Sequence, residues 1–150
     1  MSWNDFHARG AVLQLVLERA RVDPGDPGLF VDLPDIQKLF GGPDGVLLAL
    51  EHRWTTHLAA KLDQAIEDGA PPNTAWNELT AEQPELRAVL DRYARRSPSL
   101  RAAQHAERGM IGAHFNAQVH ADDSGGLGGG RQESGAAAAS PASESVVSRC

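Results

Sequence analysis

The sequence predicts an all-α protein, a six-helix bundle organised on one long central helix and followed by a disordered C-terminal tail. Three observations support this prediction. Apolar residues recur at steps of three or four through most of residues 2–119. Proline and glycine turn signals separate these periodic segments, and no alternating strand pattern interrupts them. Short connections between amphipathic helices are typical of a bundle.

The central helix is predicted over residues 43–68. Pro43 suits a first helical turn, where a backbone N–H has no partner, and Asp44 favours the positive end of the helix dipole. At about 1.5 Å per residue the helix would span roughly 35 Å, so we expect the other helices to pack on it. One apolar stripe runs along its length: Leu47, Leu50, Trp54, Leu58, Leu62, Ala65 and Ile66.

The first helix is predicted to begin at Ser2, whose hydroxyl can cap it while Asp5 completes a capping box. Gly10 weakens the middle of this helix by about 1 kcal/mol relative to alanine. The helix is expected to end by Asp23, where two turn signals follow in tandem. The face predicted to meet the core carries Trp3, Phe6, Leu13, Val16, Leu17 and Ala20, with Val12 at its edge.

Cap and proline signals place the remaining helices. A short helix over residues 34–40 is expected to begin at an Asp32 cap and to end at a left-handed Gly41. Asn73 is the expected cap of the fourth helix, and Ser97 that of the sixth, which reaches about Val119. Candidate core positions of the sixth helix are Leu100, Ala103, Ala106, Met110, Ile111 and Phe115.

The composition divides the 150 residues into two parts. Residues 1–119 are predicted to form one helical domain. Residues 120–150 are rich in glycine, alanine and serine and have almost no large apolar side chain. Such a segment cannot offset a chain entropy of about 1–2 kcal/mol per residue, so we expect it to be disordered.

Charge and cysteine content narrow the classes of function. The net charge of −6 argues against a general binder of nucleic acid, because such modules usually carry a basic face. The single cysteine, Cys150, excludes a disulfide framework and argues against a cysteine zinc site; it is either an incidental thiol or a redox or attachment point. No apolar run approaches the roughly 18 residues of a membrane span. With no secretory signal at the N-terminus, we expect a cytoplasmic protein without a membrane partner.

Motifs for catalysis or metal binding are missing from the sequence. It contains no nucleophile elbow, phosphate loop or dinucleotide fingerprint. His52 and His57 are five residues apart, which places them about 140° apart on a helix, whereas a helical zinc pair needs a spacing of three or four. His105 and His114 are interpreted as surface or boundary residues. We therefore expect no enzyme activity, no cofactor and no metal.

Two groups of residues are candidates for binding. Aromatic side chains near the central helix suggest a small-molecule pocket formed by Trp54, His57 and Trp76. A basic cluster surrounds the turn between the fifth and sixth helices, flanked by Arg87 and Arg108. It suits a small anion or an acidic partner, or is simply a solvated helix end. The core of this candidate patch is Arg92, Arg95, Arg96 and Arg101.

A binding role also predicts an exposed apolar patch of several hundred Å². We expect it either on Leu58, Leu62 and Ile66 of the central helix or on the last helix. Homodimerisation is predicted through the last two helices.

Residues 11–50 resemble the N-terminal DNA-binding region of tetracycline-repressor-type (TetR-family) regulators. Val12, Leu13 and Ala20 match the first helix of that family. Residues 40–50 look like the junction that opens its fourth helix, with Leu47 and Leu48 in the hallmark pair, and residues 83–90 are similar to a helix start in its ligand-binding half. The resemblance implies a TetR-like start over residues 1–68 and a transcription-regulating relative.

The sequence departs from this family where the DNA reader should be. Residues 30–40 have room for one short helix, whereas the family uses two. That segment contains two acids, Asp32 and Asp35, against one base, Lys38, and phosphate would repel the acids. We therefore predict a shortened regulator-like protein with a degenerate helix-turn-helix. It would act without catalysis, by binding a protein or a small ligand. A DNA-binding TetR-family regulator is the first alternative, and a small helical metal protein or enzyme is the second.

Overall fold

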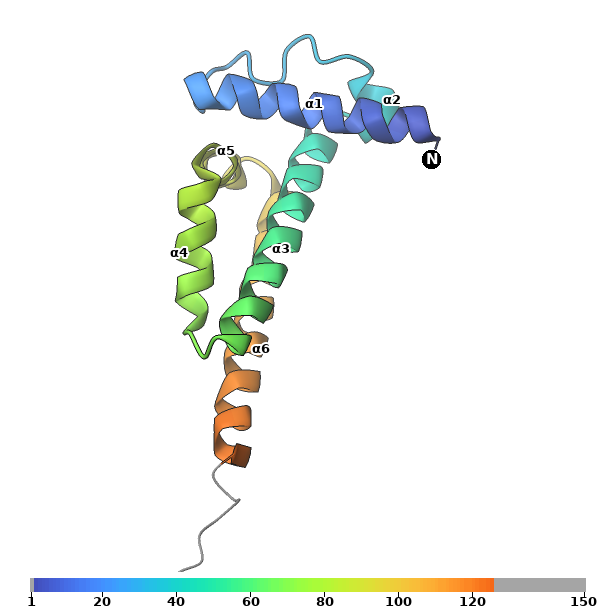
Figure 1. The fold of residues 1–150 in the computed structure, drawn as a ribbon. Helices are drawn as coiled ribbons and strands as arrows, with labels where there is room; N and C mark the ends of the chain where they lie inside the picture. Colours follow the sequence, from blue (N-terminus) through green and yellow to red (C-terminus); the bar gives the residue numbers. More distant parts are fainter. Residues whose placement is uncertain (1, 126–150) are drawn as a thin grey trace, which may run out of the picture.

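The structure of the protein is a computed structural model, in which residues 2–125 are described (Figure 1). Over this range it contains six helices and no strand, which confirms the all-α prediction. The helices are α1 (Trp3–Val22), α2 (Ile36–Phe40), α3 (Pro43–Glu67), α4 (Pro72–Glu82), α5 (Pro84–Ala94) and α6 (Pro98–Gly125). No helix within residues 2–125 is long and apolar enough to cross a membrane.

The long helix α3 is the centre of the bundle, because it contacts each of the other five helices. Figure 1 shows α4 and α6 running beside it and α1 crossing one of its ends. The predicted stripe is buried from Leu47 to Ala65, and only Ile66, at its end, is half-buried. Gly45 is required in the first turn, since a Cβ there would lie 1.8 Å from the Phe40 carbonyl oxygen.

The first turn of α1 has the predicted capping box. The Asp5 N–H donates to Ser2 Oγ at 3.1 Å, and the Ser2 N–H donates to the Asp5 carboxylate at 3.4 Å. The predicted core face is wrong at its start, because Trp3 is 73 % exposed and Phe6 is 61 % exposed, while Val12 is buried. The second half of α1 packs on the core, whereas its N-terminal turns extend past α3 and contact α2, where Asp5 pairs with Lys38 and Arg9 donates to the Leu39 carbonyl (Figure 1).

The connection from α1 to α3 differs from the prediction at its caps. The short helix α2 begins at Ile36 and not at residue 34, and its cap is Asp35. Asp32 has φ +54° and Asp35 φ +52°, so both adopt the left-handed conformation that aspartate tolerates better than most residues. The predicted left-handed ending at Gly41 is confirmed, with φ +73°.

The last three helices follow the proline signals closely. Ser97 caps α6 as predicted, since its Oγ accepts from the Leu100 N–H at 3.2 Å. The expected Asn73 cap is wrong, because α4 already begins at Pro72. Of the predicted core positions on α6, Leu100 is buried, but Ala106 and Phe115 are exposed.

The end of α6 changes the predicted domain boundary. The helix continues past Val119 to Gly125, so residues 120–125 are helical. The remaining part of the predicted tail, 126–150 with Cys150, lies outside the described residues.

Candidate functional site

The residues predicted to share a pocket do not share one in the structure. Trp54 is fully buried, and its ring meets that of Trp76 edge-on at a centroid distance of 5.3 Å. His57 points elsewhere: its Nδ1 accepts from Gln83 Nε2 at 2.7 Å, and it lines a groove between α1 and α3. Trp76 lines a different cavity, beside α5 and α6.

The predicted arginine patch is exposed, and part of it has a structural role. Arg101 donates to the carbonyls of Ala94 at 3.3 Å and Arg95 at 2.8 Å, so it satisfies the C-terminus of α5. Arg92 donates to the Gly25 carbonyl at 3.5 Å. Arg95 and Arg96 lie exposed at the same turn.

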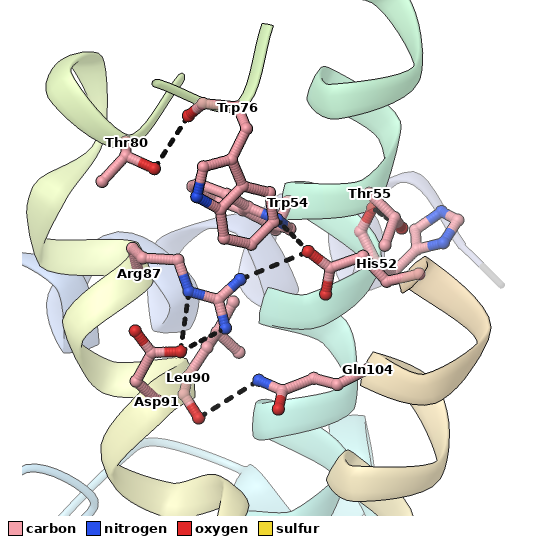
Figure 2. Close-up of polar contacts among 10 residues, drawn as sticks. His52, Trp54, Thr55, Trp76, Thr80, Arg87, Leu90, Asp91 and Gln104 are labelled. Carbon is pink, nitrogen blue, oxygen red and sulfur yellow. Dashed lines mark hydrogen bonds and ion pairs between the residues drawn. The ribbon is translucent and has the colours of Figure 1, made fainter. Parts of the chain in front are cut away.

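The predicted basic cluster is wrong about Arg87, which is buried in the core. Its guanidinium carbon lies 4.8 Å from the Trp54 ring centroid and 5.2 Å from that of Trp76, a stacking geometry that favours arginine. Its Nε and Nη2 donate to Asp91 Oδ1 at 2.9 and 2.7 Å. Figure 2 shows the guanidinium group of Arg87 beside the two tryptophan rings, with its Nε and Nη2 directed toward Asp91.

Glu107 of α6 completes this buried network. Its Oε1 accepts from Trp54 Nε1 at 2.8 Å and from Arg87 Nη1 at 3.4 Å. The side chain is 4 % exposed. One carboxylate oxygen therefore ties α3, α5 and α6 together. Beside it, Gln104 of α6 donates to the Leu90 carbonyl of α5 at 3.4 Å (Figure 2).

Glu51 is the one buried carboxyl group of the described residues whose oxygens lack a hydrogen-bond partner. It lies one turn before Trp54 on α3 and is 2 % exposed. Its pKa is raised to about 8, mainly by burial and also by a hydrogen bond and charge repulsion from the neighbouring Glu107 carboxyl, while Arg87 opposes the shift. At neutral pH this carboxyl group therefore mostly holds a proton.

Glu51 and Glu107 both line a cavity of about 330 Å³ between α3 and α6. A second cavity of about 360 Å³ lies on the other side of the network, against Trp76, Arg87 and Asp91. The buried charges thus separate two small spaces. Among residues 2–125 no three histidine, cysteine or acidic side chains come together as a metal site would require.

The groove between α1 and α3 is larger, about 1160 Å³. Its lining includes the small residues Gly10, Ala11 and Ala49 and the apolar residues Phe6 and Leu48. Its lining contains no aspartate and no glutamate. The polar lining is Gln14, Thr56 and five basic side chains: His7, Arg9, His52, Arg53 and His57.

Two members of the buried network could have been noticed in the sequence, because each is a glutamate at a core position of a helix. Glu51 follows Leu47 by four residues and precedes Trp54 by three, so it lies within the buried stripe of α3. Glu107 lies seven residues after Leu100, at the same angular position on α6. A charged residue at a core position predicts either a buried ion pair or a binding site.

Comparison of the chain with protein-family models, with curated proteins and with solved structures finds no match.

Proposed function

We propose that this protein is a non-catalytic, regulator-like binding protein whose α1–α3 groove takes an acidic amphipathic helix of a protein partner. The observation that carries the proposal is the charge of the groove. Two arginines, three histidines and no acidic side chain line it, on a chain with a net charge of −6. Such a local reversal of sign favours an acidic partner and selects against basic ones.

The apolar surface of the groove supports a helix as the occupant. Phe6 and Leu48 line it and are exposed, and Trp3 stacks against Phe6 at 6.1 Å and extends the apolar surface. An amphipathic helix buries its apolar face in a groove of this kind. The volume exceeds the roughly 300–1000 Å³ of small-molecule pockets, which favours a protein segment over a small ligand.

Gly10 supports a close approach of the partner helix. A Cβ at this position would meet no atom within 4 Å, so nothing inside the protein requires a glycine there. The residue still weakens α1 by about 1 kcal/mol relative to alanine. A helix lying over Gly10 would make use of the missing side chain.

Arg53 is the cation that the partner's carboxylates would meet. It is half-buried and makes no ion pair or hydrogen bond through its side chain within residues 2–125. Arg9, by contrast, is engaged inside the protein, with the Leu39 carbonyl and over the Phe40 ring. Arg53 is therefore the residue whose charge the experiment should reverse.

The test uses a fluorescein-labelled helical peptide with leucines on one face and glutamates on the other, titrated with the full chain by fluorescence anisotropy. A matched peptide with lysines in place of the glutamates is the control. We expect saturable binding of the acidic peptide only. Gly10→Leu should weaken it at least tenfold, since the new side chain fills the groove, and Arg53→Glu should weaken it similarly.

Two variants control for unrelated effects. Gly109→Leu adds the same side chain on α6, where a Cβ also meets nothing within 4 Å, and should leave binding unchanged. Arg95→Glu reverses an exposed charge away from the groove and should change binding less than twofold. Equal binding of the two peptides, or equal effects of Gly10→Leu and Gly109→Leu, would overturn the proposal.

The segment between α1 and α3 supports a protein partner over DNA. Its single helix, α2, has five residues and one base, Lys38, whose Nζ lies 3.8 Å from the Asp5 carboxylate. A helix so short and with so little positive charge offers few contacts to phosphate or base edges. DNA binding predicts salt-dependent retention on heparin, and such retention at low salt would favour the DNA-binding alternative.

The predicted homodimer would use a different surface, formed by the last two helices. We also propose that the protein is cytoplasmic. Phe115 and Val119 on α6 are 53 % and 50 % exposed, which supports an apolar patch on the last helix. The other expectation is wrong, because Leu58 and Leu62 are buried. Sedimentation velocity at micromolar concentration tests the dimer, and a monomer there would count against it.

A further inference from the structure

The cavity between α3 and α6 opens to the surface at His52 and Ala106 and has a mixed lining. Its walls are apolar where Leu48 of α3 faces Ala103, Ala106 and Met110 of α6. Its volume of about 330 Å³ is at the lower end of the range for small-molecule sites. Glu51 also lines this cavity, and both its carboxyl oxygens are shielded from solvent.

The buried charges around this cavity do not balance when both glutamates are ionised. Arg87 is the one cation, and its hydrogen bonds go to Asp91 and Glu107. Glu107 also accepts from Trp54, whereas both oxygens of an ionised Glu51 have no partner; only a protonated Glu51 can donate to Glu107. A buried carboxylate without a partner is costly, so this position needs a proton or a second cation.

We propose that the α3–α6 cavity binds a small organic ammonium ion, with Glu51 accepting its N–H groups and Ala103, Ala106 and Met110 contacting its alkyl part. This site is separate from the α1–α3 groove and goes beyond the function proposed above. A metal ion fits less well. Calcium takes about six to eight oxygen ligands, and residues 2–125 hold no group of three or more metal-ligating side chains.

Binding at this site is linked to pH, because the ammonium ion and a proton compete for the Glu51 carboxylate. The groups that face Glu51 are Glu107 from α6, Arg87 and Asp91 from α5, and His52 beside it on α3. Burial raises the pKa of Glu51 to about 8. As the pH increases toward this pKa, the affinity for the ammonium ion should increase by up to about tenfold per pH unit. Above this pKa the affinity should stay constant.

The experiment titrates the full chain with n-butylammonium chloride and follows amide chemical shifts by ¹H–¹⁵N NMR at about pH 6, 7 and 8.5, values that lie below and above the raised pKa of Glu51. Calorimetry in two buffers of different ionisation enthalpy measures the protons released. We expect saturable shifts on α3 and α6, tighter binding at the higher pH, and release of up to one proton per ion at pH 7.

Two probes separate the sources of binding. Sodium chloride at equal ionic strength tests for screening alone, and n-butanol tests for filling of the apolar cavity alone. Neither should reproduce the saturable shifts. If either does, the carboxylate does not select an ammonium ion and the proposal is wrong.

Two pairs of variants locate the site. Glu51→Gln keeps the shape of the side chain, removes its charge, and should weaken butylammonium binding at least tenfold; Glu67→Gln, exposed on the same helix, should leave it unchanged. Ala106→Leu fills the cavity from α6 without altering a carboxyl group and should also abolish binding, while Ala113→Leu, exposed on α6, should not. Full binding by Glu51→Gln or by Ala106→Leu would overturn the proposal.

Discussion

The start of α1 exposes large apolar side chains, whereas the junction of α3, α5 and α6 buries charged ones. Trp3 and Phe6 are exposed at the first, whereas Glu51, Arg87 and Glu107 are buried at the second. The difference follows from the neighbours of each region. The first turns of α1 extend past α3, while the junction is enclosed by three helices (Figure 1). Exceptions to the usual burial of apolar residues are informative, and here each lies at a proposed binding site.

The largest effect is expected from removing Arg87, the single buried cation among residues 2–125. Arg87→Met keeps much of the side-chain volume but leaves Glu107 without its ion pair, next to Glu51. Breaking a buried pair by removing one partner typically costs about 3–5 kcal/mol. Urea unfolding followed by tryptophan fluorescence measures the loss. Arg95→Met, an exposed arginine just after α5, is the control and should change stability by less than about 0.5 kcal/mol.

A small loss for Arg87→Met would contradict this account of the junction. It would mean that protonation or contact with solvent removes the cost of an unpaired Glu107 carboxylate. Arg87 would then contribute little to the stability of the junction. The exposed end of α1 would then be the only region whose burial departs from the usual pattern for a functional reason.

The next largest effect is a pH dependence of stability caused by Glu51. Its pKa is raised to about 8 in the folded protein and is near 4.5 as an ordinary glutamate. Between these values the folded state binds more protons than the unfolded state, so stability is highest below about pH 4.5 and falls as the pH rises toward 8. The slope from this group cannot exceed about 1.4 kcal/mol per pH unit.

Glu51→Gln isolates this contribution. The difference in unfolding free energy between the variant and the parent should move in favour of the variant from pH 5 to pH 8, a window of about three units over which linkage applies. Denaturant titrations at each pH measure it. Glu67→Gln, exposed on the same helix, should show no such trend. A pH-independent difference for Glu51→Gln would show that its carboxyl group titrates normally.

How well the sequence predicts a structural feature depends on whether the feature is set by local sequence or by packing between helices. The stripe of α3, the Ser2 capping box and the Pro43 start of α3 depend on local patterns and are confirmed. The exposure of Phe6 depends on where α1 extends past α3, which periodicity does not contain. The sequence therefore predicted a core face that is correct only in the second half of α1.

The buried network could be predicted only in part. The positions of Glu51 and Glu107 within apolar stripes mark them as unusual from sequence alone. Their meeting with Arg87 depends on the packing of α5 against α3 and α6, which brings together residues 20 or more positions apart. The same dependence on packing explains why His57, on the same helix as Trp54, lies at a different cavity.

A smaller change in stability, in this case a gain, is expected from a substitution at Gly10 in α1. Gly10→Ala should stabilise the protein by about 0.5–1 kcal/mol, because alanine favours the helix and its Cβ meets nothing within 4 Å. Chemical denaturation measures the gain. The same substitution at Gly45 is the contrasting case and should destabilise, since its Cβ would clash with the Phe40 carbonyl. A loss of stability for Gly10→Ala would point to an internal role for that glycine.

The smallest effect on stability is expected at the exposed aromatic side chain of the groove. Phe6→Ser removes an apolar group that is already largely in water, so its cost should be within about 0.5 kcal/mol. Phe115→Ser on α6 is the matched control, because Phe115 is exposed to a similar degree and lies far from the groove lining. Both variants should unfold like the parent chain, but only Phe6→Ser should weaken the acidic peptide, by about fivefold or more for an interface anchor worth about 1 kcal/mol. A large loss of stability for Phe6→Ser would mean that this aromatic end belongs to the core after all. Equal peptide binding by the two variants would mean that its exposure has no part in recognition.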